Sequence, residues 1–213
     1  MELENNKIQI IGKVISDPKL DHEIYGEKML RITVSVGRRS GVADNLRVKY
    51  SDRLGIELSN GDIAEINGRV SSANIYRNDG SRKLDIYIFA NAINHVQALP
   101  SETGITHRNS AHLECYLVME PKYRTTPSGR EITELFVAAN RNYNKSDYIP
   151  VIAWGRNARY AKNLAVGQKI AAEGRLQSRE YQKTLSNGNT ETRTAYEIST
   201  HAIELLYDDE TNY

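Results

Sequence analysis

Trp154 is the only tryptophan in the chain, and it ends an apolar stretch, 148–154, that reads Y-I-P-V-I-A-W. Alternate residues of an extended strand point to opposite faces. Ile149, Val151 and Ala153 fill one face, which leaves Tyr148 and Trp154 on the other with Ile152. Cationic and aromatic residues close by in sequence are Arg141, Tyr143, Lys145 and Arg156. Nucleic-acid bases stack on such rings while Arg and Lys neutralise phosphates, so the stretch predicts a surface for a flat anionic ligand. The alternative is that Trp154 packs as ordinary core.

The sequence has none of the common motifs of an enzyme active site or a metal site. The sequence lacks a phosphate-binding Gly-Lys loop, a G-x-S-x-G turn and any metal-ligand spacing among its five histidines. The single cysteine, Cys115, lies inside an apolar run and is expected to be a small buried side chain, not a redox group. We therefore predict a binding protein that is not an enzyme and needs no cofactor or metal.

Charge and composition are compatible with an anionic partner. Over residues 7–85 there are 14 Lys and Arg against 11 Asp and Glu, and over residues 108–204 there are 14 against 10. The remaining acids lie near the two ends and in the stretch between these segments. No window has the roughly 18 to 20 apolar residues of a membrane span, and no secretory signal begins the sequence, so we predict a cytoplasmic protein without a membrane role.

The chain repeats itself. The segment L58-S-N-G-D-I-A-E-I-N-G-R-V70 reappears as L164-A-V-G-Q-K-I-A-A-E-G-R-L176, at an offset of 106. Upstream, Gly26 matches Gly129 and Arg38 matches Arg141 at an offset of 103. The sequence predicts a tandem duplication: a first copy over residues 1–100, a linker over 101–110, a second copy over 111–207 and a short acidic tail over 208–213.

Each copy has the pattern of a small β-barrel. The segment 30–36, L-R-I-T-V-S-V, alternates apolar and polar residues as a half-buried strand does. Residues 157–165 place alanines and a leucine at helical spacing before Gly167, and hairpins are expected at Asp79-Gly80 and Asn187-Gly188. Roughly five strands per copy, with one short helix between the third and fourth, predict an all-β fold of two tandem five-stranded OB-fold barrels.

The second copy resembles the bacterial single-stranded DNA-binding protein (SSB) family. The resemblance rests on the ordered segments N140-R-N-Y143, Y148-I-P-V-I-A-W-G-R156, N157–A165, V166-G-Q-K-I-A-A-E-G-R-L176 and Q177-S-R-E-Y181. It implies sequence-independent binding of single-stranded DNA in replication, recombination or repair, at the nucleoid. Four aromatic positions that stack bases in the family fall on Tyr143, Tyr148, Trp154 and Tyr181. Cationic residues expected at phosphates are Arg175, Arg179, Lys145 and Lys183, together with Arg141 and Arg156.

The first copy keeps the framework but loses the aromatic platform. On 46–50, L-R-V-K-Y, the parity of Leu46 and Val48 turns Tyr50 inward, and Ser51 stands where the second copy has Trp154. Residues that remain as candidates for nucleic-acid contact are Arg38, Arg39, Arg47, Lys49, Tyr76 and Arg77, with Arg69 nearby. The alternative is a degenerate copy that serves as a scaffold or in oligomerisation.

The resemblance also implies an assembly of four OB folds, hence a homodimer of this two-fold chain. The tail, L205-L-Y-D-D-E-T-N-Y213, lacks the Gly/Pro/Gln-rich linker and Pro-Phe tip with which replication members of the family recruit other proteins. Contacts with replication or repair proteins and a specialised or mobile-element role therefore both stay open. The rival hypotheses are an accessory OB-fold adaptor of primosome type, whose main ligand is a protein, and an OB-containing nuclease.

Overall fold

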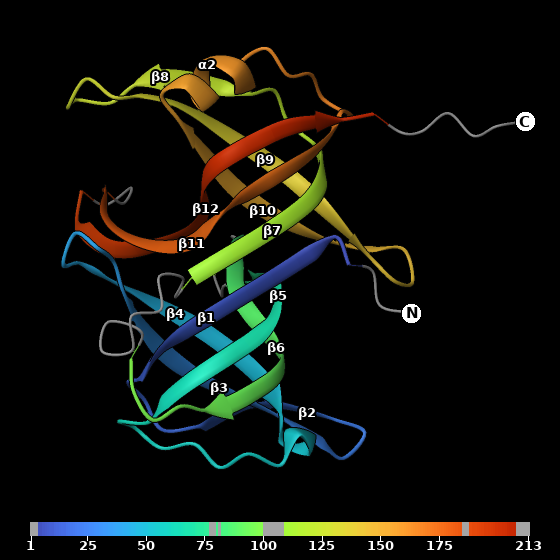
Figure 1. Cartoon of the computed structure of the whole chain (residues 1–213), viewed down its shortest axis with the longest axis vertical. Coiled ribbons are helices and arrows are strands. Elements are labelled where there is room, and N and C mark those ends of the chain that lie inside the picture. Colours follow the sequence, from blue (N-terminus) through green and yellow to red (C-terminus); the bar gives the residue numbers. More distant parts are fainter. Residues whose placement is uncertain (1–3, 77–79, 81, 100–108, 185–187, 208–213) are drawn as a thin grey trace, which may run out of the picture.

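The computed structural model describes residues 4–76, 80, 82–99, 109–184 and 188–207. The first copy forms six strands and one 3-10 turn: β1 (Asn6–Val14), β2 (Lys19–Ile24), β3 (Glu27–Gly37), β4 (Ala43–Ser51), η1 (Asp52–Leu54), β5 (Ile63–Tyr76) and β6 (Arg82–His95). The second copy repeats this order: β7 (Asn109–Leu117), β8 (Lys122–Thr125), β9 (Glu131–Arg141), β10 (Lys145–Trp154), α2 (Arg156–Ala161), β11 (Lys169–Thr184) and β12 (Thr190–Leu206). Figure 1 shows the two copies stacked along the long axis.

Each copy is a closed barrel of five strands. In the first, β1 pairs with β5 and, at its far end, with β3, while β4 pairs with β3 and lies parallel to β6. The second copy has the same pairings, including the parallel contact of β10 with β12. The short strands β2 and β8 extend the sheet at its two ends. The predicted fold of two tandem OB barrels is confirmed.

The alternation read from the sequence places the core correctly. Ile149, Val151 and Ala153 are fully buried on one face of β10. On β4, Tyr50 points inward and is 1% exposed, as the parity of its neighbours predicts. These strands have one face against a packed core, and a shift of one residue would expose every apolar side chain on them, so the register is strongly fixed.

The helical segments are shorter than expected. The prediction of a helix over 157–165 is wrong at its end, because α2 stops at Ala161. The Leu164 amide then donates to the Ala161 carbonyl, and the Ala165 amide donates to the side chain of Gln168 at 2.8 Å. The chain therefore turns towards β11 before another helical turn can form. In the first copy the equivalent segment is only the 3-10 turn η1, capped by Ser51.

The repeated glycine of the offset-106 motif marks a close crossing of two strands. Gly68 and Gly174 both lie at a shift in register, between β5 and β6 and between β11 and β12. A Cβ added to Gly68 would lie 2.1 Å from the Phe89 carbonyl oxygen, and one added to Gly174 would lie 2.3 Å from that of Ser199. Only glycine fits these bulges without moving the backbone.

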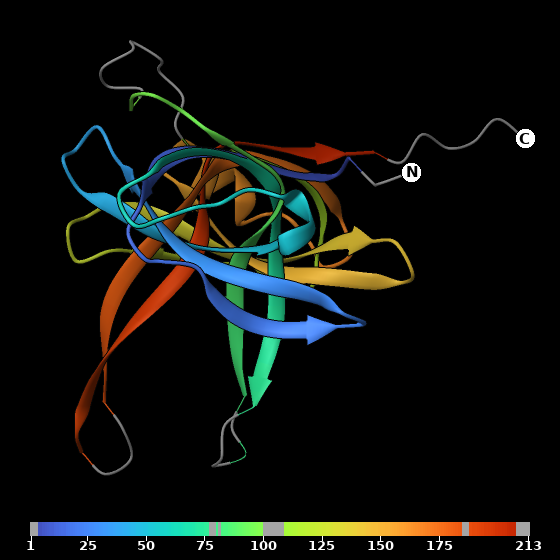
Figure 2. The same ribbon diagram turned by 90° about the horizontal axis from the view of Figure 1, so that it is seen from below.

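The predicted hairpins form long arms. The β5–β6 pairing continues to Tyr76 and Arg82, and the β11–β12 pairing continues to Thr184 and Thr190. Figure 2 shows the two arms projecting on the same side of the molecule. Asp79, Asn187 and the predicted linker and tail over 101–108 and 208–213 lie outside the described residues, and β7 begins at Asn109, two positions inside the predicted linker.

The two copies join through an antiparallel ladder between β1 and β7. Its register is centred on Ile8 and Ala111, so that Asn6 pairs with Leu113 and, symmetrically, Ile10 pairs with Asn109. The offset of 103 relates Asn6 to Asn109 and Ile10 to Leu113, so exchanging the two copies leaves the ladder unchanged. The chain therefore has an internal two-fold axis at this pair of residues.

Two equivalent polar joints flank the ladder. The buried carboxylate of Asp147 accepts from the Ser72 amide at 2.8 Å, and the Tyr148 amide donates to the Ser72 hydroxyl at 2.7 Å. In the other joint, Asp44 accepts from the Ser178 amide at 2.7 Å, and the Asn45 amide donates to the Ser178 hydroxyl at 3.0 Å. Each joint connects one copy's fourth strand to the other copy's fifth, so the two barrels are fixed relative to each other.

Cys115 lies on β7 with no exposed surface, as predicted for a small buried side chain. Burial raises the pKa of its thiol to about 12, so the reactive thiolate is absent at neutral pH. We expect no reaction of the folded protein with a thiol-specific disulfide reagent at pH 8, and one equivalent of reaction once the protein is unfolded in guanidinium. Rapid reaction of the folded protein would contradict this burial.

Candidate nucleic-acid interface

Trp154 ends β10 on the outer face of the second barrel. Its ring is partly buried, and its indole N–H donates to the hydroxyl of Ser199 on the neighbouring strand β12 at 3.0 Å. This bond fixes the orientation of the ring without covering it. Trp154 is therefore neither a fully buried core residue nor a free surface side chain, and it meets the geometric requirement for a stacking platform.

Two hollows meet at this ring. One is a groove of about 740 Å³, and the other is a hollow of about 720 Å³. Both are lined by Trp154, Arg130 and Arg175. Arg39 reaches the second hollow from the turn between β3 and β4, so the first copy contributes to the surface around the second copy's tryptophan.

The arginines around Trp154 differ in how they are held. Within the described part of the chain, no carboxylate forms an ion pair with Arg39, Arg130 or Arg175. Arg179 lies 3.7 Å from Glu197 and over the ring of Tyr181, and Arg124 pairs with Glu134 at 2.6 Å. The first three cations thus keep an uncompensated charge near Trp154, and such groups are suited to phosphates.

Tyr148 forms a second aromatic surface on the same strand. Its ring is 43% exposed and stacks on Phe136 of β9, with ring centroids 6.0 Å apart and planes 19° apart. Phe136 was not identified as a site residue from the sequence, although its position between Leu135 and Val137 gives it the outward parity. Arg130 was also missed, because it follows the turn at Gly129 and no strand pattern assigns it a direction.

Tyr181 and Lys183 lie farther out, on the arm formed by β11 and β12. Tyr181 is 37% exposed, opposite Arg193 in the ladder, and Lys183 is exposed beyond it. Arg175 and Arg179 share this strand face and are exposed, as their odd parity predicts. Arg156 is exposed at the start of α2, one residue after the strand turns at Gly155.

The corresponding face of the first copy is filled by its own ion pairs. Arg47 pairs with the buried carboxylate of Asp85 and lies over the ring of Tyr196, 4.4 Å from its centroid. Lys49 pairs with Asp21 at 2.9 Å and lies over another tyrosine ring, that of Tyr87. Both cations point outward from β4 as predicted, but each already has an anionic partner, so binding to DNA would have to break these contacts.

Two other candidate residues of the first copy, Arg38 and Tyr76, do not lie on the outer face of β4. Arg38 pairs with the buried Asp44 and donates to the Ser178 carbonyl at 3.1 Å, and therefore belongs to the joint between the copies. Tyr76 is 74% exposed at the end of β5, on the first copy's arm. Arg77 lies outside the described residues.

Tyr143, Arg141 and Lys145 do not join the hollows at Trp154. They belong to the end of β9, the turn after it and the start of β10, and they line a separate pocket of about 320 Å³ together with Lys7, Gly68 and Arg69 of the first copy. Arg141 also forms an ion pair with Asp147 at 3.3 Å. The structure thus separates the four predicted aromatic positions. Tyr148, Trp154 and Tyr181 lie on strands of the second barrel, whereas Tyr143 lies in a turn that faces the other barrel.

The described residues offer little else for chemistry. No group of three or more His, Cys, Asp or Glu side chains among them is placed to hold a metal ion. No helix in the described ranges has the length and apolar character needed to cross a membrane.

The second copy is similar in sequence to known proteins. The model of the "Single-strand binding protein family" matches residues 108–206. A single-stranded DNA-binding protein of Clostridium tetani is 33% identical over 73 residues, which cover 31% of this chain and 50% of that protein. Single-stranded DNA-binding protein 1 of Staphylococcus aureus is 36% identical over 73 residues, covering 31% of this chain and 44% of that protein. The chain thus spans about half the length of the curated relatives it matches.

The whole fold has a counterpart among solved structures. The crystal structure of the wild-type single-stranded DNA binding protein from Thermus aquaticus covers 100% of this chain, and the match extends over 97% of the Thermus chain. The TM-score is 0.75 and the sequence identity is 20%. At this identity the likeness establishes the fold, and it includes both barrels and not only the second.

Proposed function

We propose that the chain binds single-stranded DNA without regard to sequence, because residues 108–206 match the model of the single-strand binding protein family. The family is not enzymatic, which confirms the prediction of a binding protein. The observation that carries the proposal is the tryptophan at the meeting point of two hollows, with Arg39, Arg130 and Arg175 around it. Rings and phosphate contacts serve every base alike, which explains the lack of sequence preference.

The lone tryptophan allows a direct test. We expect oligo(dT) to quench the fluorescence of Trp154 strongly, a duplex of equal length to quench it weakly, and added salt to weaken the binding through counterion release. Unchanged fluorescence with oligo(dT), together with no mobility shift of the same DNA, would mean that Trp154 is structural and would favour the adaptor hypothesis. Loss of the DNA strand in the presence of a divalent metal ion would instead favour a nuclease.

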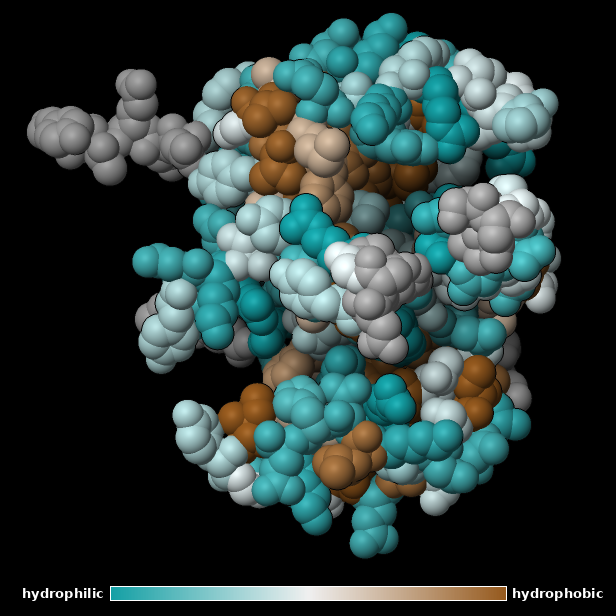
Figure 3. Space-filling view, turned by 180° about the vertical axis from the view of Figure 1, so that it is seen from behind, coloured by the Kyte–Doolittle hydropathy of each residue, from teal (hydrophilic) through white to brown (hydrophobic). Residues whose placement is uncertain are grey.

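The first copy is the part that favours a protein-binding adaptor, because ion pairs occupy the outer face of its β4. Figure 3 shows one face of the molecule, where hydrophilic residues predominate around the junction of the copies and a larger group of apolar residues lies on the upper barrel, the second copy. Large contiguous apolar patches are the usual mark of a protein-binding surface. The polar surface at the junction therefore supports DNA binding at that place, whereas the apolar group on the second copy also favours the adaptor.

Arg39 tests whether the first copy contributes to the binding surface at Trp154. We expect Arg39→Ala to weaken binding of oligo(dT) and to lower the slope of log K against log salt by about 1, the amount for one lost phosphate contact. Arg53→Ala is the matched control, because this arginine is 69% exposed, pairs with Glu27 and lines none of the hollows described above. Equal slopes for both variants and the parent protein would exclude Arg39 from the interface.

We also propose that two chains assemble into a homodimer with four OB folds, acting in the cytoplasm at the nucleoid in replication, recombination or repair. Both edges of β1 and of β7 are already paired within the chain, so the surface that joins two chains lies elsewhere. Sedimentation equilibrium is expected to give about twice the chain mass of 24.1 kDa. A mass equal to that of one chain would contradict the dimer.

A further inference from the structure

A buried carboxylate lies on the surface where a base is expected to stack. Glu197 of β12 lines the groove of about 740 Å³ at Trp154, and it also lines a smaller hollow of about 240 Å³ together with Phe136, the residue on which Tyr148 stacks. On β12 it precedes Ser199, the acceptor of the indole bond, by two positions, so both side chains lie on the same face of the strand. Glu197 therefore borders both aromatic surfaces of the second barrel.

Neighbouring side chains hold this carboxylate in one position. Glu197 is 7% exposed, and Gln177, its partner in the β11–β12 ladder, is 5% exposed. The amide nitrogen of Gln177 donates to Glu197 Oε1 at 2.7 Å, and the amide oxygen accepts from Arg175 at 3.4 Å. These two contacts fix which end of the amide faces Glu197. The carboxylate is therefore in place before a ligand arrives.

The fold uses only one of the two carboxylate oxygens. Among the residues that the structure describes, the bond from Gln177 and the ion pair with Arg179 at 3.7 Å both go to Oε1 of Glu197, and none bonds to Oε2. An ionised carboxylate only accepts hydrogen bonds, and a buried acceptor without a donor is unfavourable. A donor carried by a ligand in the groove would satisfy this second oxygen.

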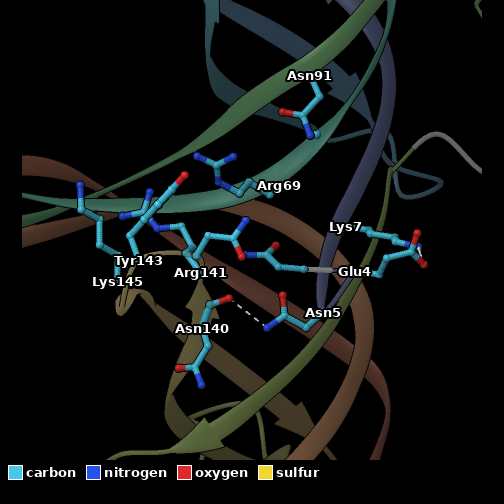
Figure 4. Close-up of a pocket in the computed structure, with 12 residues that line it drawn as sticks. Glu4, Asn5, Lys7, Arg69, Asn91, Asn140, Arg141, Tyr143 and Lys145 are labelled. Carbon is cyan, nitrogen blue, oxygen red and sulfur yellow. Dashed lines mark hydrogen bonds and ion pairs between the residues drawn. The ribbon is translucent and has the colours of Figure 1, made fainter. Parts of the chain in front are cut away.

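Two carboxylates near other hollows are bonded directly to cations. Figure 4 shows the separate pocket between the copies, where Glu4 is bonded to Lys7 at 2.7 Å. On β9, Glu134 accepts twice from Arg124, at 2.9 and 2.6 Å. The ion pair of Glu197 is longer, and its side chain is far more buried than those of Glu4 and Glu134. The structure thus keeps a weakly neutralised negative charge inside a groove that is otherwise suited to an anion.

The edge of a base fits such a group better than a phosphate does. A phosphate and a carboxylate repel each other. The donors on the bases of a single strand include the exocyclic amino groups of cytosine, adenine and guanine, and Glu is a known acceptor for the amino group of cytosine. Thymine has no amino group, and the carbonyl oxygens beside its one N–H repel a carboxylate. The chemistry therefore favours an amino-bearing base over thymine.

We propose that Glu197 accepts a hydrogen bond from the exocyclic amino group of the base that stacks at Trp154, which gives the protein a preference against thymine at this one position. The inference rests on the proposed function, because it requires a base stacked at Trp154. Stacking and phosphate contacts elsewhere still serve every base. The strand can shift along the surface to place a suitable base there, so the preference depends on base composition and not on an ordered sequence.

The test compares oligo(dC) and oligo(dT) of equal length on the full chain and on Glu197→Gln. Glutamine has one oxygen, which the bond from Gln177 occupies, and it presents a donor in place of Oε2. We therefore expect the variant to bind oligo(dT) more tightly and oligo(dC) more weakly. The ratio of the oligo(dC) affinity to the oligo(dT) affinity is expected to fall by about 5-fold or more, the usual discrimination of a side chain that reads a base edge. Fluorescence anisotropy of labelled strands at pH 8, where cytosine is neutral, measures both affinities.

Two controls isolate the amino group. Glu134→Gln also removes one negative charge from the outer face of the second barrel, but this carboxylate is held by Arg124, so the variant is expected to change both affinities by the same factor. Oligo(dU) lacks the methyl group of thymine and has no amino group, so it is expected to respond as oligo(dT) does. Urea unfolding establishes that Glu197→Gln is folded.

The outcomes separate this inference from the proposed function. If the parent protein binds none of the single strands, the proposed function itself fails. If the parent binds and Glu197→Gln changes all affinities by one factor, only the role of Glu197 is overturned. The same conclusion follows if Glu134→Gln lowers the ratio as much, because general charge then explains it, or if oligo(dU) responds as oligo(dC), because the methyl group then explains it.

Discussion

Trp154→Ala is expected to lower the affinity for oligo(dT) by roughly 5- to 150-fold, because a stacked base contributes about 1 to 3 kcal/mol. The bond from the indole N–H to Ser199 holds the ring in one orientation between the two hollows, so little ordering is needed when a base arrives. The affinity is best measured by fluorescence anisotropy of a labelled oligonucleotide, since the variant has no tryptophan fluorescence. Circular dichroism establishes that the variant is folded.

Two further variants make this result specific. Trp154→Phe keeps an aromatic ring and is expected to retain most of the affinity, although it loses the bond to Ser199. Ser51→Ala changes the equivalent position of the first copy and is expected to leave DNA binding unaltered. An affinity of Trp154→Ala equal to that of the parent protein would assign the tryptophan a structural role only.

The sequence predicts the barrel strands well where one face of a strand is buried. The alternation of 46–50 and of 148–154 gives the inward residues correctly, including Tyr50, because a core on one side fixes the register. Ile152, expected on the outer face with Tyr148 and Trp154, is nevertheless buried, at 7% exposed. The repeated glycines are also predictive of structure, because Gly68 and Gly174 lie at the same bulge in the two copies. The end of the helix after Trp154 was less predictable, because the side chain of Gln168 redirects the chain there.

The relations between the two copies could not be predicted from the pattern. Arginines such as Arg38 and Arg47 are the residue type expected at a phosphate-binding surface. In the folded structure they instead form ion pairs with Asp44 and Asp85, which the sequence pattern does not predict. Tyr143 matches the family's pattern for a stacking residue, but its turn reaches the other barrel and separates it from Trp154. The alternation of apolar and polar residues predicts on which face of a strand a side chain lies. Which residues that side chain contacts depends on how the two copies are joined.

Asp147→Ala is expected to lower the free energy of unfolding by about 3 to 5 kcal/mol, the usual effect of removing one partner of a buried ion pair. The carboxylate has no exposed surface, accepts from the Ser72 amide, and lies near Arg69 and Arg141. Its burial raises the pKa of this carboxyl, while the Ser72 amide and the two arginines act in the opposite direction. Alanine would leave the amide without its acceptor and two partly buried cations without their shared counter-charge.

Urea unfolding measures this loss, provided that different spectroscopic probes give one coincident transition. Asp147→Asn retains an acceptor for the Ser72 amide but not the charge, so a smaller loss than with alanine is expected. Glu134→Ala is the surface control, because Glu134 and Arg124 are 39% and 50% exposed and such pairs contribute about 0 to 1 kcal/mol. If Asp147→Ala were as stable as Glu134→Ala, the joint at Asp147 would contribute no more to stability than a surface ion pair, and the β1–β7 ladder and the Asp44 joint would hold the two barrels together.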